Sequence, residues 1–149
     1  MLPFGTRKEI AQISIEEYFT EEEYRKIFIN DIEKYLPKPN YTYITLRELS
    51  KKISRPIILM GTDVINSIDS WKESEEIKQY PIIKANRSGY TLDKNIECNI
   101  IDTISASSNI SSTKIRKLML SNPKEILNNK YMTEKSFLLY YEFYKSQNI

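Results

Sequence analysis

Short apolar runs that alternate with helix patterns constrain the fold of this chain more than any other feature of the sequence. Residues 56–60 form a wholly apolar run, and residues 81–85 and 99–104 are two further strand candidates. Short apolar runs are typical of strands buried on both faces of a parallel sheet. One helix pattern at 42–53 precedes the first run, another at 70–79 separates the first two runs, and a third begins at Ser112 after the last run. This alternation predicts an α/β fold with a parallel sheet and right-handed crossovers.

Polar residues follow each predicted strand. Gly61 and Asp63 come after the first strand, Arg87 after the second, and the segment 111–116 after the third. Ligands of open α/β sheets bind beyond the carboxyl ends of the strands, near the point where the strand order reverses. The architecture therefore predicts that these residues converge on one edge of the sheet.

The segment Ser111-Ser112-Thr113-Lys114-Ile115-Arg116 has the features of a helix start. Ser111 is a good N-cap residue, and the first amides of a helix have no internal partners. These amides carry the positive end of the helix dipole, so a phosphate is a natural ligand for them. Arg116 adds a charged, planar guanidinium group that can bind the same anion. The alternative is a well-capped surface helix with a solvated arginine, and the residues alone leave both interpretations open.

Length and composition limit the remaining possibilities. The length of 149 residues predicts one domain spanning 1–149. The 22 basic and 20 acidic side chains are interspersed along the sequence, so their distribution indicates neither a nucleic-acid groove nor a membrane-binding face. The one cysteine, Cys98, excludes an internal disulfide and favours a reducing cytoplasm, with Cys98 itself in the core. Three glycines exclude a dinucleotide fingerprint and a Walker loop, and the lack of histidine argues against a zinc site.

Several motifs together resemble a known family. Ile-Ser-Ser-Thr-x-Ile-Arg at 110–116 resembles the C-terminal signature of the nucleotidyltransferase superfamily, most closely its nicotinate-nucleotide adenylyltransferase branch. The apolar run 56–60, the Gly-Thr-Asp turn and Trp71 resemble the strand, Gly-x-Asp turn and downstream tryptophan of that branch. Tyr41-Thr42, residues 82–89 and residues 130–132 are similar to other segments of the branch, in the same order.

This resemblance implies a Rossmann-like parallel sheet with flanking helices and an adenylyltransferase activity. The expected reaction transfers AMP from ATP to nicotinate (or nicotinamide) mononucleotide in NAD biosynthesis, with Mg²⁺ carried by the ATP phosphates and pyrophosphate as the leaving group. Catalysis of this kind depends on positioning and on neutralising negative charge. Two alternatives remain: a non-catalytic nucleotide-binding remnant or subunit on the same fold, and a small α/β interaction module.

The resemblance also assigns roles to individual residues. The expected substrate-binding and nucleotide-binding residues are Thr42, Gly61, Asp63, Trp71, Arg87, Ser111 and Ser112, and the expected catalytic residues are Thr113 and Arg116. The hydroxyl-rich helix start and Arg116 would hold the ATP phosphates.

The substrate-side roles each compete with a structural alternative. Gly61 would allow close backbone approach to the ligand, or it is an ordinary turn residue. Asp63 would contact the ribose or the substrate, or it stabilises the turn. Trp71, expected in the first turn of a helix and partly exposed, would stack on the pyridine ring, or it packs in the core. Thr42 would contact the substrate carboxylate, although Ile44 replaces an aspartate of the family, and Arg87 is either a ligand-binding or a solvated turn residue.

One family motif is absent. The family binds the ATP phosphates with a His-x-Gly-His motif after its first strand, and this chain contains no histidine. We therefore expect an N-terminally incomplete domain without the first strand–helix unit, and losing such transition-state contacts lowers rates by about 10²- to 10³-fold. Removing a central strand also leaves unpaired strand edges. Three outcomes are open: another chain supplies the strand, the remaining strands close the gap, or the sequence is a truncated product.

Overall fold

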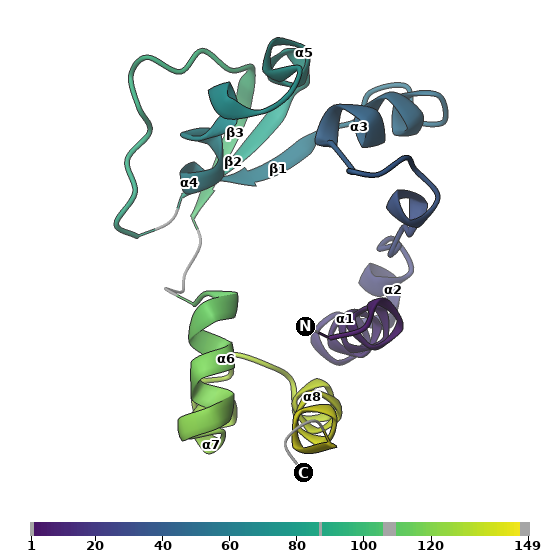
Figure 1. The fold of residues 1–149 in the computed structure, drawn as a ribbon, viewed down its shortest axis with the longest axis vertical. Coiled ribbons are helices and arrows are strands. Elements are labelled where there is room, and N and C mark those ends of the chain that lie inside the picture. The colour runs from purple at the N-terminus through teal and green to yellow at the C-terminus, as the bar shows by residue number, and fades with distance from the viewer. Residues whose placement is uncertain (1, 87, 106–109, 147–149) are drawn as a thin grey trace. The chain divides into compact units, whose positions relative to one another are not determined.

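The computed structural model of the chain describes residues 2–86, 88–105 and 110–146 (Figure 1). The chain divides into two compact units, one comprising Asp31–Asn109 and the other comprising Met1–Asn30 with Ile110–Ile149. Each unit has its own hydrophobic core, and we describe each by itself. The single domain expected for 1–149 stays a prediction.

The first unit, here called the sheet unit, contains a parallel sheet of three strands. The strands are β1 (Ile58–Gly61), β2 (Ile82–Asn86) and β3 (Ile100–Ser105). Figure 1 shows β2 between β1 and β3, and both pairings are parallel. The α/β class and the three strand positions expected from the apolar runs are therefore confirmed. In the register of the sheet, Gly61 at the end of β1 pairs with Ala85 of β2.

Short helices complete this unit. They are the 3-10 helices η1 (Ile32–Lys34) and η2 (Ile68–Ser70), and the α-helices α3 (Thr42–Ser50), α4 (Thr62–Ile65) and α5 (Ser74–Gln79). The core consists of Leu46, Met60, Ile65, Ile68, Ile77 and Ile82. Burial alternates along β1, because Met60 is buried whereas Leu59 is 63% exposed. The expectation that 56–60 is buried on both faces is therefore wrong for Leu59 and for Ile57, which is 54% exposed.

In the second unit, here called the helical unit, the described residues form five helices. They are α1 (Phe4–Tyr18), α2 (Glu21–Tyr24), α6 (Ser112–Ser121), α7 (Lys124–Asn128) and α8 (Glu134–Ser146). Its core is formed by Met119, Ile126 and Phe137. The side chain of Glu17 on α1 accepts a hydrogen bond of 3.2 Å from the backbone N–H of Lys135 on α8. This bond joins segments from opposite ends of the chain.

The helix expected over 70–79 begins later than the sequence pattern suggests. Ser70 lies in η2, and its hydroxyl donates to the carbonyl of Ser67 at 2.7 Å, so it does not cap a following helix. Glu73 has a left-handed backbone with φ 55°, and α5 begins only at Ser74. Trp71 consequently lies in an extended connection between η2 and α5, not in the first turn of a helix.

The helix pattern at 42–53 is confirmed at its start and is shorter at its end, because α3 stops at Ser50. Among the residues that the structure describes, none of the helices has the length and apolarity needed to span a bilayer.

Candidate functional site

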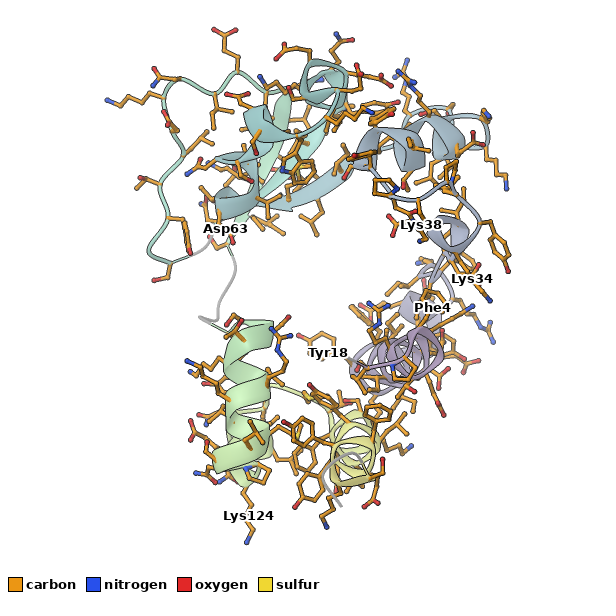
Figure 2. The ribbon with its side chains drawn as sticks, viewed as in Figure 1. Phe4, Tyr18, Lys34, Lys38, Asp63 and Lys124 are labelled. Atoms are coloured by element: carbon orange, nitrogen blue, oxygen red, sulfur yellow. The ribbon has the colours of Figure 1, made fainter. Side chains whose placement is uncertain are left out.

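The turn between β1 and α4 places a carboxylate at the carboxyl edge of the sheet. Gly61 ends β1 and precedes α4 with φ −70° and ψ 152°, a backbone conformation that any residue adopts. A Cβ atom on Gly61 would lie 2.6 Å from Oδ1 of Asp63. The lack of a side chain on Gly61 therefore leaves room for the Asp63 carboxylate in this position, which Figure 2 shows where α4 begins.

Thr62 connects this turn to the neighbouring strand. Its side chain is buried, and its hydroxyl donates a hydrogen bond of 3.2 Å to the carbonyl of Ala85 near the end of β2. The carboxyl ends of β1 and β2 are thus joined through a side chain. Sequence analysis did not single out Thr62; the available signal was a hydroxyl residue directly after an apolar strand.

Two other residues expected to bind substrate lie in the sheet unit. Trp71 is half-buried and packs against the core, so it is partly exposed as expected and also contributes to packing. Thr42 is the first residue of α3, as expected, and is half-buried. Arg87 lies outside the described residues, and its role stays a prediction.

The start of α6 has the predicted cap. Ser111 is the N-cap residue, and its hydroxyl accepts a hydrogen bond of 3.1 Å from the backbone N–H of Lys114. Its carbonyl accepts the first helical hydrogen bond, from the N–H of Ile115 at 3.0 Å. The hydroxyl of Ser111 therefore satisfies one of the helix-terminal amides from within the chain.

The two residues expected to be catalytic contact each other. Nη2 of Arg116 donates to the hydroxyl of Thr113 at 3.3 Å, and both residues are exposed. Lys114 lies between them in the sequence, and its side chain contacts Tyr131. Its ammonium group lies 5.0 Å from the ring centroid of Tyr131 and 3.2 Å from the Tyr131 hydroxyl. A charged side chain near the helix start is thus held by an aromatic ring.

A cavity of about 780 Å³ opens beside this helix start, a volume within the usual range of small-molecule sites. We call it the α6 cavity. Its lining residues are Leu2, Arg7, Ile10, Ile110, Ser111, Ser112, Ile115, Arg116, Tyr131, Met132, Tyr140, Phe143 and Tyr144. All of them belong to the helical unit. In the part of the chain that the structure describes, this lining includes two arginines and no aspartate or glutamate.

Tyrosines form part of the cavity wall. Tyr140 and Tyr144 meet edge to face with ring centroids 6.4 Å apart. Burial raises the pKa of Tyr140; nearby Arg116 acts in the opposite direction, and Tyr144 raises the pKa further. Tyr140 is therefore protonated and uncharged at neutral pH, so its hydroxyl can donate a hydrogen bond.

The structure groups the expected residues into two sets. Ser111, Ser112 and Arg116 line the α6 cavity, whereas Gly61 and Asp63 lie at the end of β1 in the sheet unit. Their convergence on one edge stays a prediction.

Among the described residues there is no group of three or more His, Cys, Asp and Glu side chains arranged to hold a metal ion. Cys98 is half-buried against the sheet core, as expected, and burial raises the pKa of its thiol.

The chain is similar to known nucleotide-transferring proteins in sequence. The family model described as cytidylyltransferase-like matches residues 6–118. The probable nicotinate-nucleotide adenylyltransferase of Acholeplasma laidlawii (strain PG-8A) is 29% identical over 108 residues, which are 70% of this chain and 55% of that protein. This chain therefore spans about half the length of the curated relative.

The fold is similar to that of Plasmodium falciparum nicotinic acid mononucleotide adenylyltransferase in two solved structures. One is complexed with NaAD and gives a TM-score of 0.77; the other is complexed with APC and gives 0.78. Both solved proteins are 21% identical to this chain. Each alignment covers 96% of this chain, and it covers 74% of the first solved chain and 75% of the second. At this identity the likeness shows the Rossmann-like fold.

Proposed function

The chain belongs to the cytidylyltransferase-like family, and we propose that it acts as an adenylyltransferase in NAD biosynthesis. The proposed reaction joins ATP to nicotinate mononucleotide. A phosphate oxygen of the mononucleotide attacks the α-phosphorus of ATP, the bond between this phosphorus and the bridging oxygen breaks, and pyrophosphate leaves. The products are nicotinate adenine dinucleotide and pyrophosphate.

The α6 cavity is the observation that carries this proposal. It joins the capped start of a helix of ten residues, Ser111 and Ser112, to the guanidinium group of Arg116. Helix N-termini and guanidinium groups both bind phosphate and neutralise part of its charge. We assign the triphosphate of ATP to this cavity, with Arg116 and Thr113 as the proposed catalytic residues. Arg116 lines the cavity, whereas Thr113 is not among the lining residues and is linked to the cavity through its hydrogen bond with Arg116.

The acceptor is assigned to the sheet unit. The carboxylate of Asp63 beside Gly61 supports a contact with ribose hydroxyls, since a carboxylate accepts hydrogen bonds from two adjacent hydroxyl groups. The half-buried indole of Trp71 supports stacking on a pyridine ring. Thr42 and Arg87 complete the proposed acceptor residues. Mg²⁺ would arrive on the phosphates of ATP and would neutralise part of their charge.

The lack of histidine favours a second candidate, a nucleotide-binding subunit without catalytic activity of its own. Any histidine that stabilises the transition state must come from polypeptide outside these 149 residues. ATP binding is common to both candidates, and turnover separates them.

The test combines binding with a product assay. ATP binding is measured by calorimetry, and formation of nicotinate adenine dinucleotide from ATP, Mg²⁺ and nicotinate mononucleotide is measured by chromatography under single-turnover conditions. Product formation that is lost in Arg116→Ala and kept in Lys117→Ala supports the enzyme. ATP binding without product supports the binding subunit. No heat of ATP binding at millimolar concentration contradicts both.

A further inference from the structure

A second arginine lines the α6 cavity from an element far away in the sequence. Arg7 lies in the first turn of α1, where its backbone N–H donates to the carbonyl of Pro3 at 3.1 Å. Its guanidinium carbon lies 5.9 Å from the ring centroid of Phe4. The resemblance to the adenylyltransferases gave Arg7 no role, and α1 reaches the cavity only because the chain folds back on itself.

The guanidinium groups of Arg7 and Arg116 differ from those of Arg25 and Arg47, which each pair with a carboxylate. Arg25 pairs with Glu21, and Arg47 pairs with Glu76. Within the described residues, neither Arg7 nor Arg116 has a carboxylate partner, and no carboxylate lines the cavity. The chain as a whole carries nearly equal numbers of acidic and basic side chains. A cavity with two permanent positive charges and no negative charge selects an anion.

We propose that Arg7 is a second anion-binding residue of the α6 cavity and holds the polyphosphate chain of the nucleotide together with Arg116. This inference rests on the proposed nucleotide site. Guanidinium groups contributed by two different helices can bind different phosphates of one chain, and each forms charge-assisted hydrogen bonds. The cavity therefore binds di- and triphosphates more tightly than monophosphates.

A polyphosphate bound to Arg7 would also affect the stability of the helical unit. Arg7 is on α1, which packs against α8 through the hydrogen bond between Glu17 and Lys135, and α8 contributes Tyr140 and Tyr144 to the cavity. A polyphosphate held by α1 and α6 would connect the two ends of the helical unit. Ligand binding should consequently raise the melting temperature of the protein.

Calorimetry on the full chain with inorganic tripolyphosphate tests the inference, because this probe has no base or ribose. We expect Arg7→Ala and Arg116→Ala each to weaken tripolyphosphate binding about tenfold, the range of a lost charge-assisted contact. Arg7→Lys should keep part of the affinity. Lys8→Ala and Lys117→Ala remove the same charge from adjacent positions that do not line the cavity, and should change the affinity less than about twofold.

The outcomes separate this inference from the proposed function. If Arg7→Ala binds like Lys8→Ala while Arg116→Ala still binds weakly, the inference is wrong and the nucleotide site stands. If tripolyphosphate binding depends on both arginines but no dinucleotide forms, the inference holds and adenylyl transfer fails. If the wild-type chain binds neither tripolyphosphate nor ATP at millimolar concentration, both are wrong. Circular dichroism confirms folding, and Arg7→Gln replaces Arg7→Ala if the alanine variant unfolds.

Discussion

Oδ1 of Asp63 lies 2.6 Å from the position that a Cβ atom on Gly61 would occupy. Two carboxyl-edge residues that sequence analysis treats separately are therefore one feature of the structure. Gly61 needs no unusual backbone, so its lack of a side chain serves the carboxylate. A side chain at residue 61 would therefore move the Asp63 carboxylate and change any contact that it makes with a ligand.

Gly61→Ala should displace the Asp63 carboxylate and destabilise the sheet unit by about 0.5–1 kcal/mol, because the added methyl group overlaps the end of the Asp63 side chain, which must change its rotamer. The free energy of unfolding in urea measures the effect. In an Asp63→Ala background the same change should be nearly neutral, since the overlapping oxygen is gone, and this difference is the coupling of the two residues. An equal loss of stability in both backgrounds would contradict the explanation.

Gly5→Ala is the matched control for that substitution. Gly5 lies in α1, and a Cβ atom there would have no neighbour within 4 Å. Alanine favours a helix over glycine by about 0.5–1 kcal/mol, so we expect this variant to be unchanged or more stable.

Thr62→Val should destabilise the protein by about 1–2 kcal/mol, because it removes the hydrogen bond to the Ala85 carbonyl at nearly constant side-chain volume. Thr103→Val is the control, since Thr103 is an exposed residue of β3. The urea midpoints of the two variants give the comparison. Equal midpoints would mean that the buried hydroxyl adds nothing to the pairing of β1 and β2.

Substitutions at Ser111 should separate its capping role from its proposed phosphate contact. Ser111→Ala loses the cap on Lys114 and should lower stability by about 1 kcal/mol. Ser111→Asp keeps a capping oxygen and should preserve stability, whereas its negative charge should repel a phosphate and abolish ATP binding. Thermal melting and calorimetry measure the two properties. Undiminished ATP binding in Ser111→Asp would remove the helix start from the site.

Acid should weaken the connection between α3 and α5. Nε of Arg47 donates to Oε1 of Glu76 at 2.9 Å, and these hydrogen bonds hold the pKa of Glu76 below its ordinary value. A carboxyl group with a lower pKa in the folded state adds stability above its unfolded-state pKa, and this stability is lost as the pH falls through the folded-state pKa.

The urea midpoint of the wild-type chain should therefore decrease more steeply between about pH 6 and about pH 3 than that of Glu76→Gln. Glu97→Gln, at an exposed position, is the control and should follow the wild-type curve. Identical slopes for the wild type and Glu76→Gln would show that the pair contributes no pH-dependent stability.

Local sequence signals predicted the elements that depend on few neighbours. The strands near 58–61, 82–86 and 100–105 follow from their own apolar residues, and the cap at Ser111 follows from its position before an amphipathic segment. The capping-box spacing at residues 70–73 predicted the wrong start for α5, because the capping side chain has two possible hydrogen-bond partners. The Ser70 hydroxyl could cap a following helix or bond to the preceding turn, and the structure has it bonded to Ser67.

The sequence by itself determined the α/β class, the parallel strands, the start of α6 and the absence of any histidine, because each depends on composition or on residues within one turn of one another. Tertiary structure alone decided that Asp63 occupies the space beside Gly61, that Thr62 bonds to Ala85, and that Arg7 lines the same cavity as Arg116. These are contacts between side chains whose positions depend on how separate elements pack, and no local pattern records that packing.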